Sequence, residues 1–552
     1  SIPGSDLHQL RQSLRGALLL PGDAGYDTAR RVLNESIDRK PALIVQPSGP
    51  ADVRTAVDFA RQHDLLLAVK CGGHSYAGKS TCDGGLQIDL SHMRSVRVDP
   101  VARVAQVSGG SLLGELDHEA MALGLVTTAG TVSHTGVGGL TLGAGFGRLA
   151  RRFGLACDNV RAVDIVTADG RLLRASAHEN ADLYWGVRGG GGNFGVVTSF
   201  EFAMHPMPRQ VIGGPMIFPI ERARDLLPAY AEISASAPDE LYLDALMATR
   251  PGEPGVFILE SCYSGPPAQA ERVLAPLRKL GTPLADRLGP IDYCALQRSN
   301  DRTDPRNEGA YLKSGFIDAF PGELAQALLD GYEPHPDRGT VVFFQHAGGA
   351  IARVPVTATA FPHRRATHNM FAMVSWPLTD DSTPHVAYVK SYWKTLERYT
   401  DGYYTNEVAD EGQHVIDENY QGNLPRLQQV KNKYDPQNLF RLNANVKPTV
   451  LARRVARRAA GRRVVRRCRR GTAARASALG RAQQTDRGDI LRSAVEEELD
   501  RGGERTAGRE HRIDREALAV AQILWKTLGV GRRLEGLLVA HHAQEPDLGG
   551  RQ

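Results

Sequence analysis

The sequence predicts a fold that mixes helices and strands, and three observations support this class. The chain has 552 residues, which is enough for two or three domains with large buried cores. Residues 42–69 show a strand, helix and strand in succession, and residues 84–110 alternate apolar and polar positions as paired strands do. Glycine is abundant, with 58 residues, and gathers in three stretches between residues 69 and 202.

The first unit is read directly from periodicity. Residues 42–45 are predicted to form a strand, and the Pro/Ser-rich residues 47–50 to form a turn. A helix is predicted over 51–63, because its apolar residues recur at helical spacing. The next strand, 65–69, runs into "VKCGGHSYAG" at 69–78. This unit therefore ends in a bare glycine turn that carries a histidine.

The following segments continue the mixed pattern. Residues 84–110 predict two or three strands, and "SLLGELDHEAMALGL" at 111–125 predicts a helix. Glycines then crowd two more stretches, "TAGTVSHTGVGGLTLGAGFG" at 128–147 and "WGVRGGGGNFGVVTSFEF" at 185–202. These stretches are the main chemical signal in the chain.

Glycine-rich loops let a backbone approach a ligand closely, so that N–H groups can face phosphates. Three such loops predict a large, extended, anionic ligand such as a dinucleotide. None of them has the strand–turn–helix setting of a Rossmann fingerprint, with an acidic residue about 20 positions on. The alternative is that they are tight turns in a β-rich fold, although His74 within the first loop favours the ligand.

Composition and charge exclude several functional classes. The chain is 42% hydrophobic, with a net charge of +5. Its six cysteines show no zinc or disulfide spacing, and no metal set is predicted. The apolar stretch 517–525 is about half of a membrane span, so no membrane association is expected. We expect a cytoplasmic protein, and a removed export signal stays possible because the chain starts at Ser1.

The basic character belongs to the C-terminal residues. Residues 451–552 hold 23 Lys/Arg against 13 Asp/Glu, whereas residues 1–450 are mildly acidic. Ten arginines and no acid lie in 451–470. Three interpretations stand: a disordered basic appendage that binds nucleic acid or an acidic partner, a small helical module around 515–542, or out-of-frame translation of a GC-rich gene.

Four segments in combination resemble the berberine bridge enzyme-like flavoproteins of the vanillyl-alcohol oxidase/PCMH superfamily. The resemblance covers roughly residues 20–448. The segments are "VKCGGHSYAG" (69–78), "TVSHTGVGGLTLGAGFGRLARRFGLACDNV" (131–160), "ADLYWGVRGGGGNFGVVTSFEF" (181–202) and "NLPRLQQVKNKYDPQNLFRLNANV" (423–446).

The resemblance implies an α+β fold in which an FAD-binding domain is assembled from two parts of the chain. The first part is 1–210, and the second is a return segment, 431–450. Between them, 211–430 would form a substrate domain with an antiparallel sheet covered by helices. Residues 451–552 would then be an Arg-rich tail, disordered or weakly helical.

In this family the histidine of the "GGH" turn is bonded covalently to FAD, and the resemblance assigns that role to His74. A neutral imidazole is a nucleophile, which suits the attachment. Many members carry a second bond from a cysteine, but the matching position here is Val132. Cys157 lies downstream in a different motif and is expected to be a buried small residue. We therefore predict a single link, as in singly linked bacterial oxidases of the family.

Further FAD contacts are carried over from the matching motifs. They fall in the first glycine turn, the second glycine loop, the "DN" pair that follows it, the strand after the third loop, and the terminal segment. Each of these residues could instead serve ordinary packing. The residues are Lys70, Cys71, Gly72, Gly73, Ser75, Thr135, Gly136, Gly138, Gly139, Asp158, Asn159, Gly195, Val196, Val197, Asn443 and Asn445.

The reaction implied is flavin-dependent oxidation, which needs a base. Several relatives use a tyrosine in a "YLNY"-type stretch, and "YYTNEVADEG" at 403–412 places Glu407 there. A carboxylate removed from water has a raised pKa, which suits a general base. Tyr404, Tyr420 and His346 are rival candidates. Alternation in "VVFFQHAGGAIARV" puts His346 on the face opposite Gln345.

The predicted function is therefore an FAD-linked oxidase, with a dehydrogenase as a variant. It would oxidise a small alcohol, sugar or amine, perform hydride transfer to flavin N5, and use O2 as acceptor to give hydrogen peroxide, in bacterial secondary metabolism. The alternative is a flavin-fold protein that acts through its basic tail on nucleic acid or a partner. Binding of nucleic acid is not expected from the charge of the first 450 residues, and the sequence defines neither the substrate nor the oligomeric state.

Overall fold

A computed structural model describes residues 2–301, 308–407 and 412–449. All described residues belong to one compact unit of the chain. The predictions made for the tail, 451–552, lie outside the described residues.

A four-stranded sheet, ordered β1-β2-β4-β3, opens the chain. The strands β2, β4 and β3 are parallel, and β1 pairs antiparallel with β2. Helix α3 connects β2 to β3 and buries its apolar side on the sheet, together with the sheet's Leu43 and Val45. The elements are α1 (Gly4–Ser13), β1 (Ala17–Leu19), α2 (Tyr26–Arg30), β2 (Leu43–Gln46), α3 (Pro50–Gln62), β3 (Leu67–Lys70) and β4 (Leu86–Asp89).

An antiparallel five-stranded sheet follows, ordered β5-β6-β10-β8-β9. Its core includes Trp185 and Phe194 and also Leu427, Val430 and Tyr434 from helix α15. The elements are β5 (Val96–Asp99), β6 (Val104–Ser108), α4 (Leu113–Met121), α5 (Val137–Leu142), α6 (Ala150–Phe153), β8 (Val160–Thr167), β9 (Leu172–Ser176), α7 (Ala181–Val187), β10 (Gly195–Ala203), α14 (Gln413–Asn419) and α15 (Leu424–Tyr434), with a ribbon of β7 (Leu125–Val126) and β11 (His205–Pro206).

The C-terminal segment is thus an integral part of the N-terminal half. Lys431 is fully buried, and its Nζ donates to Asp435 Oδ2 (2.7 Å), Asn193 O (2.8 Å) and Phe440 O (2.8 Å). Asn193 also donates to Ala444 O at 2.8 Å. We call residues 2–207 together with 413–446 the split domain.

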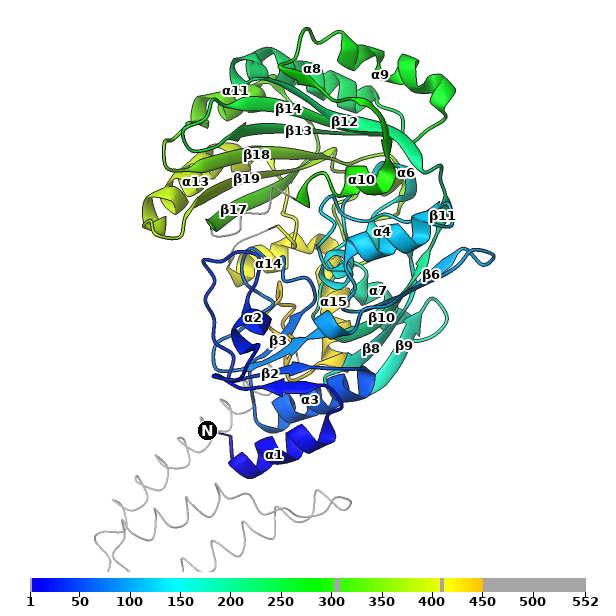
Figure 1. The fold of residues 1–552 in the computed structure, drawn as a ribbon, viewed down its shortest axis with the longest axis vertical. Helices are drawn as coiled ribbons and strands as arrows, with labels where there is room; N and C mark the ends of the chain where they lie inside the picture. Colours follow the sequence, from blue (N-terminus) through cyan, green and yellow to red (C-terminus); the bar gives the residue numbers. More distant parts are fainter. Residues whose placement is uncertain (1, 302–307, 408–411, 450–552) are drawn as a thin grey trace, which may run out of the picture. The chain divides into compact units, whose positions relative to one another are not determined.

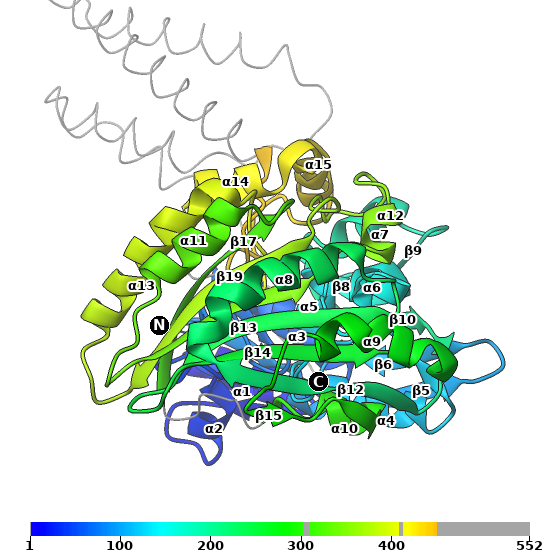
Figure 2. The same cartoon turned by 90° about the horizontal axis from the view of Figure 1, so that it is seen from above.

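An eight-stranded antiparallel sheet occupies the middle of the chain, and we call residues 210–396 the sheet domain. Figures 1 and 2 show helices α8, α11 and α13 lying across its outer face, with the split domain on the other side. The elements are β12 (Gln210–Pro219), α8 (Ala223–Ser236), β13 (Leu241–Thr249), β14 (Val256–Tyr263), α9 (Ala270–Arg278), β15 (Ala285–Asp286), β16 (Gly289–Asp292), α10 (Tyr293–Gln297), β17 (Glu308–Ile317), α11 (Gly322–Gly331), β18 (Gly339–His346), α12 (Ala350–Arg353), β19 (His368–Pro377) and α13 (Ser382–Leu396).

Alternation along the strands decides which side chains meet the helices. Val342 and Phe344 of β18, like Ala372 and Val374 of β19, are buried in the core with the three helices. Their neighbours point to the opposite face, because successive strand residues alternate. The predicted α+β class is confirmed, and the strands and helices predicted over 42–69 agree with β2, α3 and β3 to within two residues.

Candidate active site

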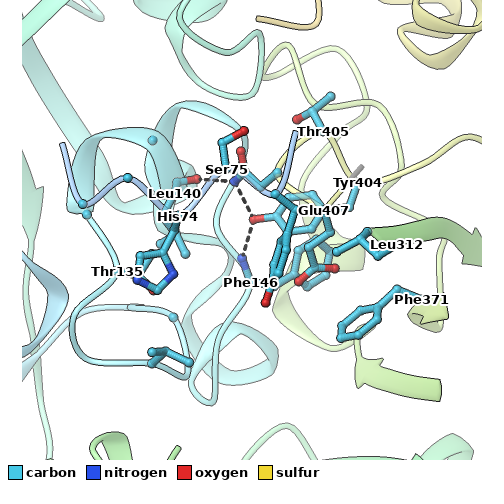
Figure 3. Close-up of a pocket in the computed structure, with 18 of the residues that line it drawn as sticks. His74, Ser75, Thr135, Leu140, Phe146, Leu312, Phe371, Tyr404, Thr405 and Glu407 are labelled. Carbon is cyan, nitrogen blue, oxygen red and sulfur yellow. Dashed lines mark hydrogen bonds between the residues drawn. The ribbon is translucent and has the colours of Figure 1, made fainter. Parts of the chain in front are cut away.

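A cavity of about 970 Å³ is lined by both domains. The split domain supplies the three glycine-rich loops and the C-terminal segment around Asn443. The sheet domain supplies the open face of its large sheet, and residues 404–407 complete the lining. Figure 3 shows His74 and Thr135 on one side, with Glu407, Leu312 and Phe371 across from them.

The first two glycine loops cross in contact, and at the crossing there is no room for a side chain. A Cβ added to Gly72 would lie 2.4 Å from Gly136 N, and one added to Gly136 would lie 2.4 Å from Gly72 N and from Cys71 Sγ. Gly73 has φ 71°, a conformation that favours glycine. A Cβ on Gly139 would meet no protein atom within 4 Å, and Gly139 lines the cavity. The loops therefore bring bare backbone to the cavity wall, as an extended anionic ligand requires.

His74 lies where the two loops meet. Its Nδ1 is 3.2 Å from Thr135 Oγ1, and its Nε2 is 2.7 Å from His134 Nδ1. Both neighbours come from the second glycine loop. The imidazole is thus fixed at the cavity wall by both ring nitrogens, so its orientation and tautomer are set by the loop beside it.

Glu407 reaches the cavity next to the sheet. Asn369 Nδ2 of β19 donates to its Oε2 at 2.6 Å and lies 3.3 Å from Gln345 Oε1 of β18. Burial raises the pKa of Glu407 to about 7, and the hydrogen bond from Asn369 lowers that pKa in part. Near neutral pH this carboxyl can therefore both accept and release a proton.

Tyr404 holds residues 404–407 on the second glycine loop. Its hydroxyl oxygen accepts from the backbone N–H groups of Gly145 (3.1 Å) and Phe146 (3.4 Å) and from Asn406 Nδ2 (2.9 Å). Asn406 Nδ2 also donates to Leu140 O at 3.0 Å (Figure 3). Burial raises the pKa of Tyr404 above its usual range, so the phenol stays protonated. Tyr404 therefore fixes residues 404–407 to the second glycine loop.

Tyr420 lines the cavity but contacts backbone. Its hydroxyl donates to Ala444 O at 3.3 Å and to Gly190 O at 3.4 Å. Burial raises its pKa as well. Tyr420 therefore ties the third glycine loop to the C-terminal segment.

His346 is not brought to the cavity. The alternation predicted for its strand is present, but the cavity lies on the face of Gln345. His346 is buried on the helix side, where Leu243 N donates to Nδ1 (3.3 Å) and Nε2 lies 3.0 Å from Ser234 O. Burial lowers its pKa well below the usual value. We therefore set it aside as a base.

Four of the expected FAD contacts also lie away from the lining. Asp158 accepts two hydrogen bonds from the buried Arg364, at 2.7 and 2.8 Å. Asn159 Nδ2 donates to Phe153 O and Leu155 O. Lys70 Nζ donates to Ala29 O, and Asn445 is likewise absent from the wall. These four residues therefore lie outside the cavity wall.

The remaining predicted residues line the cavity together. Val132 also lines it, at the position without a thiol, whereas Cys157 is fully buried away from the wall. The predicted residues in the lining are His74, Cys71, Gly72, Gly73, Ser75, Thr135, Gly136, Gly138, Gly139, Gly195, Val196, Val197, Asn443, Glu407, Tyr404 and Tyr420.

Sequence reasoning missed the contribution of the sheet. Asn369 donates to both Glu407 and Gln345. Phe343, Phe371 and Met373 form part of the wall. Period-two alternation in 341–345 and 369–375 carried the signal for one exposed face. It did not say which face meets the cavity.

Among the described residues, no helix is long and apolar enough to cross a membrane. That same part of the chain contains no cluster of His, Cys, Asp or Glu that could hold a metal ion.

Comparison with known proteins identifies the family. Residues 41–176 match the FAD binding domain model, and residues 398–447 match the berberine and berberine-like model. An FAD-linked oxidoreductase from Dictyostelium discoideum is 32% identical over 448 residues, covering 80% of this chain and 97% of that protein. The chain belongs to the berberine bridge enzyme-like FAD-linked oxidoreductases. It is therefore an enzyme, and its cofactor is FAD.

Two further relatives place this berberine bridge enzyme-like protein among oxidases. The crystal structure of 6-hydroxy-D-nicotine oxidase from Arthrobacter nicotinovorans has a TM-score of 0.72 and 27% identity, covering 79% of this chain and 98% of that one. A xylooligosaccharide oxidase from Thermothelomyces thermophilus is 28% identical over 458 residues, covering 77% of this chain and 90% of that protein. The crossing glycine loops fit FAD, because their glycines bring bare backbone to the cavity wall, which suits an anionic pyrophosphate.

Proposed function

We propose that the protein is an FAD-linked oxidase of a small alcohol, sugar or amine. The observation that carries the proposal is Glu407, a carboxyl group with a pKa near neutrality that Asn369 holds on the wall of the FAD cavity. FAD, when bound, would supply the hydride acceptor, N5, and its reoxidation by O2 would give hydrogen peroxide. Two similar proteins are named as oxidases, one of 6-hydroxy-D-nicotine and one of xylooligosaccharides.

In this proposal Glu407 takes the proton from the substrate O–H or N–H. Asn369 occupies Oε2, so we assign Oε1 to the substrate. Loss of the proton to Oε1, with loss of hydride from the adjacent carbon, converts an alcohol to a carbonyl or an amine to an imine. Tyr404 keeps the loop in place while the carboxyl changes charge.

The base is tested with Glu407→Gln, which keeps the shape of the side chain and removes its basicity. Anaerobic reduction of the flavin by a turned-over substrate should slow by about 10²- to 10⁴-fold. In the wild type the rate should rise with pH through about 7, where Glu407 loses its proton, and then level off. The variant should lose this rise. Near-wild-type reduction by the Gln variant would remove Glu407 from the mechanism.

We also propose that FAD is attached covalently, through His74 alone. The imidazole lies at the cavity wall between the two glycine loops. The test is acid precipitation of the holoprotein, followed by the visible spectrum and mass of the pellet. Flavin should stay with the wild type and with Cys157→Ala, and should leave His74→Ala. Release from the wild type would refute the attachment, and retention by His74→Ala would refute attachment through His74 alone.

A further inference from the structure

The open face of the large sheet carries two complete rows of apolar side chains. Strand register places Ile258, Leu246, Phe343 and Phe371 opposite one another across β14, β13, β18 and β19. The row beside it, in the same register, extends to β17. It consists of Val256, Ala248, Val341, Met373 and Leu312.

All nine side chains line the cavity. Eight of them are half-buried, whereas the residues that alternate with them on β18 and β19 are fully buried beneath the helices. From strand spacing, these rows span about 19 Å across the sheet and about 7 Å along the strands. The floor of the cavity is therefore long, narrow and apolar.

Polar groups lie along one long side of this floor. Gln345 and Asn369 face each other across β18 and β19, one step along the strands from Phe343 and Phe371. Asn369 holds Glu407 on that side. The proposed base is therefore set at the edge of the apolar rows.

Two polar side chains beside the rows already have protein partners. Glu260 is paired with the buried Arg148, and Thr249 Oγ1 lies 2.6 Å from Tyr332 Oη. A sugar ring laid on the rows would bury several hydroxyls against side chains that neither donate nor accept. A buried hydroxyl without a hydrogen-bond partner weakens binding.

We propose that the substrate is an elongated, mainly apolar aryl or alicyclic molecule with one hydroxyl or amino group at its end, and not a saccharide. Its ring system packs on the two rows, and its terminal O–H or N–H lies against Glu407. This substrate class rests on the proposed function. It goes further than that function because it excludes one of the three substrate types.

The experiment is isothermal titration calorimetry on the full-length holoprotein. The probes are cinnamyl alcohol and 4-phenylbenzylamine on one side, and cellobiose and xylobiose on the other. The aryl probes should bind at least 30-fold more tightly, with the negative heat-capacity change of apolar burial. Saccharide binding that is as tight or tighter overturns the inference, and so does failure of both aryl probes to bind.

Two variants locate the binding on the floor. Met373→Gln, nearly isosteric, should weaken the aryl probes about tenfold, and Phe343→Leu should weaken them several-fold. Leu378→Gln, an exposed position just beyond β19, is the matched control and should change nothing. Unchanged affinity in both floor variants overturns the inference. Because calorimetry measures binding without turnover, this outcome is separate from failure of the proposed oxidation, which the Glu407 and His74 variants report.

Discussion

The split domain and the sheet domain meet the same cavity with different parts of the polypeptide. The split domain presents backbone, through loops that cross so closely that a Cβ at Gly72 or Gly136 has no space. The sheet domain presents side chains, on the face of its strands that no helix covers. A backbone surface suits a cofactor shared by a whole family, whereas a side-chain surface can change one residue at a time. Substitutions should accordingly abolish function in the first domain and alter selectivity in the second.

The sharpest test compares two glycines. Gly136→Ala should lower the FAD content of the purified protein at least about tenfold, because the added Cβ would overlap Gly72 N and Cys71 Sγ. Gly289→Ala in β16 of the sheet domain meets nothing within 4 Å and should load FAD normally. The ratio of flavin to protein absorbance measures both. Normal loading of Gly136→Ala would break the comparison.

The next effect concerns stability of the split domain. Lys431→Met removes one partner of a buried ion pair and leaves the Asp435 carboxylate in the core. The expected loss is about 3 kcal/mol in the free energy of unfolding, measured in urea. Lys433→Met is the control, because its pair with Asp182 is largely exposed and should cost under about 1 kcal/mol. Equal losses of unfolding free energy in the two variants would contradict a special role of the buried Lys431–Asp435 pair in stabilising the split domain.

A smaller effect is expected for Asn369 of the sheet domain, which donates a hydrogen bond to Glu407. Asn369→Leu removes the hydrogen bond that lowers the pKa of Glu407. The midpoint of the pH–rate profile should therefore move upward, by about one pH unit for a lost hydrogen bond of about 1.4 kcal/mol. The deprotonated base is the active form, so the variant should be slowest relative to wild type below neutral pH. A downward shift or an unchanged midpoint would argue against Asn369 as a positioning residue.

The smallest effect is kinetic. His134→Leu removes the 2.7 Å contact to His74 Nε2, so the imidazole loses a partner that fixes its tautomer. Covalent attachment of FAD to the freshly made protein should slow several-fold, followed by flavin fluorescence in denaturing gels. His118→Leu, at an exposed position on α4, should attach flavin at the wild-type rate. An unaltered rate in His134→Leu would leave Thr135 as the relevant contact of His74.

The same contrast explains what could be predicted from the sequence. The glycine loops could be predicted because close approach of two backbones requires glycine at particular positions in the sequence. The base position at Glu407 was reached through a family motif, and the mixed fold through periodicity. The two apolar rows could not be predicted, because they depend on the register between strands that lie up to about 130 residues apart in the chain. His346 shows the same limit, since alternation separated it from Gln345 but could not say which face the helices would take.

The buried hydrogen bonds of Lys431 also constrain the order in which the split domain can be completed during synthesis. The groups that receive its ammonium lie on either side of the sheet domain in the chain, at Asn193 and at Asp435 and Phe440. On the ribosome, the glycine loops emerge more than 200 residues before the segment that closes over them. The nascent chain must therefore carry an incomplete flavin site through synthesis of the entire intervening sheet. The complete FAD cavity, which Asn443 and Ala444 line, can therefore form only after this segment has been synthesised.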